Sequence, residues 1–103
     1  MSRVHVLAVI TAKPGLRGQI LEAFKANVPA VHAEDGCIEY GAVLDAEGVG
    51  FSTPYGGDTF VVVEKWASLD ALKAHAASDH MKAYAAKTKE LIADRVIHVL
   101  SDA

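Results

Sequence analysis

The order of strand-like and helix-like segments is the feature that most limits how this chain can fold. Four segments, VHVLAVIT (4–11), CIEYGAVLD (37–45), TFVVVEKW (59–66) and RVIHVL (95–100), are rich in β-branched and apolar residues, which is typical of strands. Between the first two strands, over 16–33, apolar side chains instead recur at helical spacing. The chain therefore alternates between two kinds of element in a defined order.

A second helical region lies between the last two strands. Ser68 is a good N-cap for a short helix over 69–76, because its hydroxyl can accept from a backbone N–H of the first turn. Ser78 is placed to cap a longer helix that runs to about Ala93. The resulting order, strand–helix–strand–strand–helix–strand, predicts a ferredoxin-like α+β fold with an antiparallel sheet and its helices on one face.

The first, third and fourth strands are apolar on both of their faces. In the third strand, for example, Val61 and Val63 alternate with Phe60 and Val62. Strands with this pattern are usually covered on both sides. Because the helices cover one face only, we expect a second copy of the sheet to cover the other, which makes a homodimer.

The bulk properties predict one globular domain over 1–103. Hydrophobic residues make up 51% and charged residues 22% of the chain, and a net charge of -3 with scattered basic residues gives no reason to expect nucleic acid or an anionic membrane as partner. Cys37 is the only cysteine, which fits a reducing compartment. The first residues are apolar over only about seven positions, so we expect a strand there and not a leader or membrane span. These observations favour a cytoplasmic protein.

A long connection precedes the third strand. The segment AEGVGFSTPYGGD (46–58) holds four glycines and one proline. Loops of this length are uncommon in compact domains and are often functional. We expect a lid or a hairpin extension that alters a neighbouring pocket.

Chemically versatile side chains gather in the stretch EKWASLDALKAHAASDHMKAY, which begins within the third strand. Period-two alternation puts Phe60, Glu64 and Trp66 on the same strand face. A carboxylate between apolar neighbours is costly to bury unless another group pairs with it. The nearest candidates in sequence are His75 and His80, on the two helices that follow.

Helical spacing adds a tyrosine to this set. His80 and Tyr84 are four residues apart and share a helix face. If the helices cover the strand face that carries Glu64, then five side chains converge on one cavity between sheet and helices. These five are Glu64, Trp66, His75, His80 and Tyr84.

Each of these residues also has a purely structural explanation. Trp66 and Tyr84 are common core residues, and Glu64 can simply pair with a histidine. Two histidines and an acid around a tryptophan nevertheless favour proton transfer, since neutral imidazole near pH 7 is a natural proton acceptor. The remaining histidines have no such companions and are interpreted as structural, although the one on the last strand is the best placed of them to reach a cavity. These are His5, His32 and His98.

Two histidines and a carboxylate are also the ligand set of non-haem iron. Here Glu64, His75 and His80 lie on three separate elements, and no surrounding sequence resembles an iron site. Zinc is no better supported, because Cys37 is far away in sequence. We therefore expect no metal. We also expect no cofactor, since the chain lacks the G-x-G-x-x-G, Walker A and G-x-S-x-G patterns.

The spacing of these residues resembles a known family. Glu64-x-Trp66, followed by His75 eleven residues after the acid and His80 five residues later, is similar to the antibiotic biosynthesis monooxygenase (ABM) domain family. The segments ITAKPG, EDGCIEY and ALKAHAASDHMKAY support the resemblance, which covers roughly residues 4–100. It implies a dimeric α+β barrel.

The resemblance implies several activities. Members include cofactor-independent oxygenases of quinols and polyketide aromatics, haem-degrading monooxygenases, and an enzyme that processes a phosphorylated autoinducer-2 signal. The haem-degrading members use an asparagine and a histidine where this chain has Ala8 and Ala85, and only Trp66 fits, so haem degradation is not expected. The acid and two-histidine spacing is closest to the small quinol-oxygenase and autoinducer-processing members, which usually lack the long connection at 46–58.

We therefore expect a cofactor-independent monooxygenase that acts on a small aromatic or quinol-type substrate with O₂. A histidine removes a phenolic proton, and the electron-rich anion reacts with O₂ directly. The predicted catalytic residues are His75, His80 and Glu64, with the choice of base between the two histidines left open. Glu64 is expected to orient an imidazole and hold its tautomer. The predicted substrate-binding residues are Trp66, Tyr84 and Phe60.

Two alternatives remain at this level. The first is an isomerase-type enzyme that acts on a small phosphorylated hydroxyketone, with the same histidines moving protons between carbons. It needs a cationic phosphate site, for which the nearby candidates are Lys65, Lys73, Lys82 and Lys87. The second is a non-enzymatic dimer that binds a small hydrophobic ligand.

Overall fold

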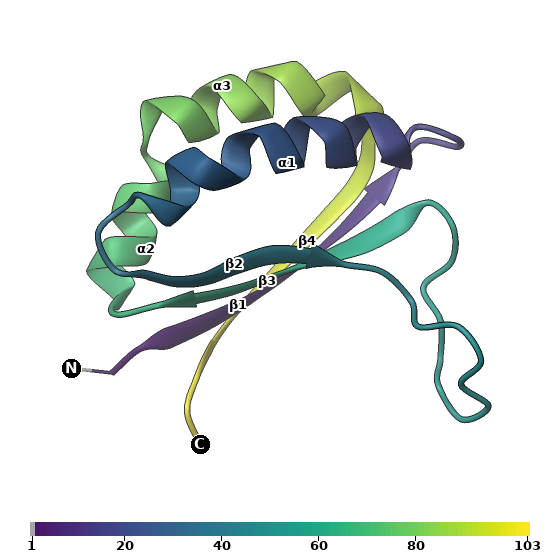
Figure 1. Cartoon of the computed structure of the whole chain (residues 1–103), viewed down its shortest axis with the longest axis horizontal. Coiled ribbons are helices and arrows are strands. Elements are labelled where there is room, and N and C mark those ends of the chain that lie inside the picture. Colours follow the sequence, from purple (N-terminus) through teal and green to yellow (C-terminus); the bar gives the residue numbers. More distant parts are fainter. Residues whose placement is uncertain (1) are drawn as a thin grey trace.

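The computed structural model describes residues 2–103 and contains one four-stranded sheet with helices on one face (Figure 1). The strands are β1 (Val4–Ala12), β2 (Cys37–Val43), β3 (Thr59–Trp66) and β4 (Ile92–Ser101). The helices are α1 (Arg17–His32), α2 (Leu69–Ala76), α3 (Asp79–Thr88) and the single 3₁₀ turn η1 (Lys89–Leu91). The predicted ferredoxin-like α+β fold is confirmed.

The sheet order places Glu64 near the middle of the sheet. The strands run β2-β3-β1-β4, and every neighbouring pair is antiparallel. Glu64 of β3 lies opposite Val6 of β1 on one side and Tyr40 of β2 on the other. Because residues opposite each other in a sheet share a face, these three side chains all point toward the helices.

The core lies between this face and α1. Alternate residues of β1 and β3 are buried, as the predicted period of two requires. They pack against Ile20, Phe24 and Val31 of α1. The ring of Phe24 stacks on Tyr40 with centroids 5.0 Å apart, which ties β2 to the same core.

Both predicted serine caps are present. The Ala71 N–H donates to Ser68 Oγ at 3.1 Å, and the Met81 N–H donates to Ser78 Oγ at 3.4 Å. Each hydroxyl thereby satisfies a backbone donor that has no partner within its helix. The two caps fix where α2 and α3 begin, and so they position the histidines that these helices carry.

The predicted end of the last helix is wrong. That helix was expected to reach about Ala93, but α3 ends at Thr88, and Ile92 already pairs with Ala12 in the sheet. The Lys13 N–H donates to the Leu91 carbonyl at 2.9 Å. Pairing with β1 therefore satisfies backbone groups that a longer helix would otherwise use, and it overrides the helical spacing of the apolar residues.

The predicted face of the second strand also needs a correction. Strict period-two alternation along CIEYGAVLD predicts that Ile38 shares a face with Tyr40 and Ala42, but the register shifts between Cys37 and Glu39. A bulge adds one residue to the strand and interrupts the alternation. As a result Cys37 lies opposite Trp66, and Ile38 is 54% exposed.

The other face of the sheet has no helix over it within residues 2–103 (Figure 1). Its apolar side chains include Leu7, Val9, Val61, Val63, Val96 and Leu100. We call these six residues the outer sheet face. An uncovered apolar face fits the expected second copy, and the dimer stays a prediction. Among the described helices, none combines the length and the apolar character needed to cross a membrane.

The connection between β2 and β3 projects away from the sheet (Figure 1). The Asp45 carboxylate closes its base by accepting from the N–H groups of Tyr55, at 2.9 Å, and Gly56, at 2.8 Å. Phe51 within it is 95% exposed. None of its described residues lines the main cavity, so the segment is an extension and does not form a lid over that cavity.

Candidate active site

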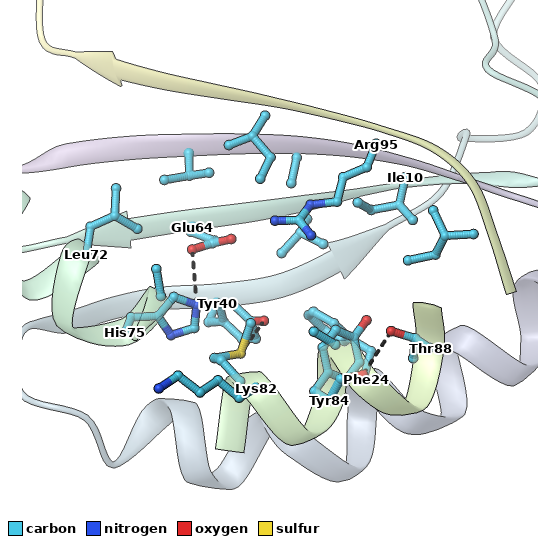
Figure 2. A pocket seen from close by; sticks show the side chains of 18 of the residues that line it. Ile10, Phe24, Tyr40, Glu64, Leu72, His75, Lys82, Tyr84, Thr88 and Arg95 are labelled. Carbon is cyan, nitrogen blue, oxygen red and sulfur yellow. Dashed lines mark hydrogen bonds and ion pairs between the residues drawn. The ribbon is translucent and has the colours of Figure 1, made fainter. Parts of the chain in front are cut away.

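A cavity of about 670 Å³ lies between the sheet and the helices (Figure 2). This volume is typical of sites for small molecules. Most of its wall is apolar and comes from β1, β4, α2 and α3. Its main polar side chains are Tyr40, Glu64, His75, Lys82, Tyr84 and Arg95.

His75 is the most enclosed titratable residue on this wall, with 4% of its surface exposed. It lies in the last turn of α2, where the Ser68 cap and the short length of the helix direct its ring back toward the sheet. The ring lies against Trp66, with centroids 4.6 Å apart, and meets Tyr40 edge-on at 5.4 Å. Packing therefore holds the imidazole in one orientation.

A carboxylate that the sequence patterns did not indicate binds both histidines. Oε2 of Glu34, in the turn after α1, lies 2.8 Å from Nδ1 of His75 and 2.8 Å from Nε2 of His80. An ionised carboxylate can only accept hydrogen bonds, so Nδ1 of His75 and Nε2 of His80 must each carry a hydrogen. When His75 is neutral, its Nε2 therefore has a free lone pair, and this nitrogen is the one that can act as a base.

Glu64 does not orient this imidazole, although it was predicted to do so. Its Oε1 lies 3.9 Å from Nε2 of His75, which is too long for a hydrogen bond, and accepts instead from Nε1 of Trp66 at 2.9 Å. Burial raises the pKa of the Glu64 carboxyl, against the opposing effects of the Trp66 N–H and of His75. Glu64 is therefore a carboxyl group in a weakly solvated wall, facing Nε2 of His75.

Two tyrosines on the wall are hydrogen-bond donors at neutral pH. Burial, and secondarily the nearby Glu64 carboxylate, raises the pKa of Tyr40 far above its usual range. Burial also raises the pKa of Tyr84 to about 12, although Arg95 opposes the shift. Both phenols therefore stay protonated and can donate to an anionic oxygen in the cavity.

The structure brings together only some of the predicted site residues. Glu64, His75 and Tyr84 lie on the cavity wall. His80 lies behind it, with 30% of its side chain exposed, and contacts Glu34 and Ser78. Trp66 and Phe60 are not on this wall. Their roles, and that of His80, stay predictions.

Trp66 and Phe60 lie deeper than a substrate can reach in this structure. Trp66 has no exposed surface and acts on the wall through its hydrogen bond to Glu64. Phe60 is 1% exposed and borders a separate cavity of about 240 Å³ beside the β2–β3 connection. His98, interpreted as structural but as the best placed of the remaining histidines, does not reach the cavity: it lies opposite Leu7, on the face away from the helices.

Sequence reasoning missed Glu34, Tyr40 and Arg95. Glu34 lies in a turn, where no periodicity indicates the direction of a side chain. Arg95 lies opposite Ile10, so strand alternation would have placed it in the cavity had the register of β4 been known. Of the lysines considered for a phosphate site, only Lys82 lines the cavity.

One group of side chains could hold a metal ion. Single donor atoms of Glu34, His75 and His80 all lie within 4.8 Å of one another. Two histidines and one carboxylate suit zinc or non-haem iron. The sequence suggested Glu64 as the carboxylate of such a set, but in the structure this carboxylate is Glu34. In the structure the same atoms are joined by hydrogen bonds.

Comparisons with known proteins give a consistent result. The family described as antibiotic biosynthesis monooxygenase matches residues 3–87. The Escherichia coli K12 protein named "Probable quinol monooxygenase YgiN" is 37% identical over 98 residues, covering 92% of this chain and 93% of that protein. Among solved structures, Rv0793 from Mycobacterium tuberculosis is 28% identical, with a TM-score of 0.82, and the match covers 99% of this chain and 96% of that one. PA3566 from Pseudomonas aeruginosa is 23% identical, with a TM-score of 0.84, and shares the fold. That match covers 100% of this chain and 96% of the other.

Proposed function

Because the chain belongs to the antibiotic biosynthesis monooxygenase family, we propose that it is a cofactor-independent monooxygenase of a small hydroquinone-type aromatic substrate. One observation carries the proposal. Glu34 holds Nδ1 of His75 at 2.8 Å, which leaves Nε2 as a free base beside a largely apolar cavity. The 37% identity to a protein named for quinol oxidation supports the substrate class.

The first step is a proton transfer. A phenolic hydroxyl of the substrate gives its proton to Nε2 of His75, and the imidazolium that forms is stabilised by the Glu34 carboxylate on its other nitrogen. The Tyr40 and Tyr84 hydroxyls donate to the phenolate oxygen. The surrounding apolar wall keeps water away from the anion.

The second step is the reaction with O₂. The phenolate gives one electron to O₂, and the resulting aryloxyl radical and superoxide combine at a neighbouring ring carbon. The peroxide takes the proton from His75 and becomes a hydroperoxide. Loss of the ring proton and cleavage of the O–O bond then give a hydroxyquinone and water. The hydroquinone supplies all four electrons, so no external reductant is needed.

The test is oxygen uptake by the purified protein with a panel of hydroquinones. We expect uptake of one O₂ per hydroquinone and a loss of about 100-fold or more in His75→Asn. His5→Asn is the control, because His5 contacts Asp102 and lies outside the cavity. No uptake with any hydroquinone, or equal rates in the His75 variant, would contradict the proposal.

One observation favours a second candidate, an isomerase-type enzyme for a small phosphorylated hydroxyketone. The cavity wall carries Lys82 and Arg95, which can bind a phosphate. His75 would then move a proton between neighbouring carbons. Such a reaction consumes no O₂, so the oxygen electrode together with NMR of the sugar-like product distinguishes the two candidates.

We also propose that the protein acts as a homodimer that covers the outer sheet face. In the single chain, Leu7, Val96 and Leu100 are 37%, 43% and 46% exposed, although they lie side by side on an apolar surface. Burial of such a patch is a strong driving force for association. Light scattering of the purified protein measures the mass directly.

A further inference from the structure

The cavity wall is basic although the chain is acidic. The whole sequence has 10 basic residues against 13 acidic ones. The wall reverses this balance: three basic residues line it, Lys82, Lys89 and Arg95, against the single acid Glu64. A concave site with this excess of positive charge attracts anions.

Arg95 is the cation best placed to contact a ligand. Its position opposite Ile10 puts it on the helix-facing side of β4. Its side chain extends over the cavity toward Glu64 (Figure 2). The two lysines come from α3 and η1, on the opposite wall. All three basic residues are exposed, so what distinguishes Arg95 is the direction of its side chain and not its burial.

The guanidinium of Arg95 forms no ion pair with an acid among residues 2–103, although its positive charge acts to lower the pKa of the nearby Glu64 carboxyl. The ion pairs in this part of the chain involve Arg3, Lys65 and three histidines, and none includes Arg95. Glu64, the acid on the same wall, already accepts from Trp66. A planar cation with five N–H donors therefore faces the cavity without a carboxylate in ion-pair contact.

We infer that the natural ligand carries an anionic group, a carboxylate or a phosphate, separate from its reacting hydroxyl, and that Arg95 binds this group. Guanidinium binds both anions in the same two-pronged geometry. The inference rests on the proposed function only for the reacting hydroxyl. It narrows the substrate class to a hydroxylated aromatic acid or, for the second candidate, a phosphorylated hydroxyketone.

Binding without turnover tests this inference first. Trp66 is the only tryptophan in the chain and is hydrogen-bonded to a wall residue, so its fluorescence can report occupancy of the cavity. The probes are hydroquinone and 2,5-dihydroxybenzoate, which differ by one carboxylate, titrated without oxygen. We expect the acid to bind about tenfold more tightly, the scale of one hydrogen-bonded ion pair.

Variants test whether Arg95 causes the tighter binding of 2,5-dihydroxybenzoate than of hydroquinone. Arg95→Met removes the charge and keeps much of the side-chain volume, so it should bind both probes equally, while Arg95→Lys restores part of the preference. Lys25→Met is the matched control, because Lys25 is exposed on α1 and outside the cavity. Equal binding of the two probes by the unaltered protein, or an unchanged preference in Arg95→Met, would overturn the inference. Circular dichroism verifies that each variant is folded.

The same proteins separate this inference from the proposed reaction. Dihydroxyacetone phosphate serves as a second anionic probe. Tighter binding of dihydroxyacetone phosphate than of 2,5-dihydroxybenzoate indicates a phosphate ligand, and the reverse order indicates an aromatic acid. Arg95-dependent binding without oxygen uptake would support the anion site and reject the oxygenase. Equal oxygen uptake with hydroquinone and 2,5-dihydroxybenzoate, together with equal affinities, would support the oxygenase and reject the anion site.

Discussion

Nδ1 of His75 lies 2.8 Å from Oε2 of Glu34, a residue 41 positions earlier in the chain. The contact joins the end of α1 to the end of α2, and it decides which nitrogen of a buried imidazole is free. Glu34 also accepts from His80, so one carboxylate orients two histidines. The positioning role that sequence spacing had given to Glu64 therefore belongs to Glu34 in this structure.

The first prediction concerns this carboxylate. Glu34→Gln keeps an acceptor for His75 but removes the negative charge that stabilises the imidazolium, so we expect kcat with a hydroquinone to fall by about 100-fold. Substrate affinity should change little, because Glu34 does not line the cavity. Steady-state oxygen uptake gives both quantities, with Glu47→Gln, in the exposed loop, as the control. A change in KM alone would show that Glu34 affects the shape of the cavity and does not stabilise the His75 imidazolium.

The second prediction concerns the pH dependence of stability. Burial raises the pKa of Glu64 in the folded protein above the ordinary value of 4.5. The favourable contribution of the protonated carboxyl is therefore fully present below about pH 4.5 and is lost as the pH rises through the folded-state pKa. Glu64→Gln cannot ionise and still offers an acceptor to Trp66. Its free energy of unfolding should rise relative to the unaltered protein between pH 4 and pH 7.

Urea unfolding at a series of pH values measures this difference. Glu22→Gln, exposed on α1, is the control, and its stability relative to the unaltered protein should vary little over the same range. Comparison at each pH cancels the contributions of other acids, including Asp45 and Asp102, whose pKa values are lowered by hydrogen bonds. A difference for Glu64→Gln that stays constant with pH would contradict the prediction.

The third prediction concerns metal ions. Glu34, His75 and His80 can form a ligand set, but the proposed reaction uses them as a hydrogen-bonded base. Treatment with EDTA, followed by its removal, should leave oxygen uptake unchanged, whereas added Zn²⁺ should inhibit by competing for the same nitrogens. Loss of uptake after chelation, restored by Fe²⁺, would instead identify a metal-dependent oxygenase.

The fourth prediction concerns assembly. Val63 lies on the outer sheet face, so Val63→Lys would place a charge in the proposed dimer interface. We expect light scattering to show the monomer mass for this variant and twice that mass for the unaltered protein. Ala83→Lys, on the exposed side of α3, should remain dimeric. If the Val63→Lys protein keeps the dimer mass, the interface does not lie on the outer sheet face.

Local rules predicted those parts of the structure that depend on neighbours in sequence. Alternation along β3 placed Glu64 on the same face as Phe60 and Trp66, and the hydroxyl chemistry of Ser68 and Ser78 located the starts of two helices. These rules failed where contacts between segments far apart in the sequence determine the conformation. Ile92 joins the sheet because β1 offers it a partner, and Ile38 leaves its expected face because of a bulge.

The site follows the same division. His75 could be proposed because it lies a short distance in sequence after Glu64, on a helix whose start was predictable. Glu34 could not, because its importance comes from a contact between turns that are far apart in the chain. Arg95 depends on the register of β4, which only its pairing with β1 determines.

The position of β4 has a consequence for access to the cavity. It is an edge strand of the sheet, and four of its residues also form part of the cavity wall: Ile92, Arg95, Ile97 and Val99. An edge strand offers unpaired backbone groups to any neighbouring chain. A partner that pairs with or packs over β4 would therefore also determine the route by which substrate and O₂ enter. Mutations along this strand can alter turnover by changing that entrance, even where they leave the proton-transfer residues intact.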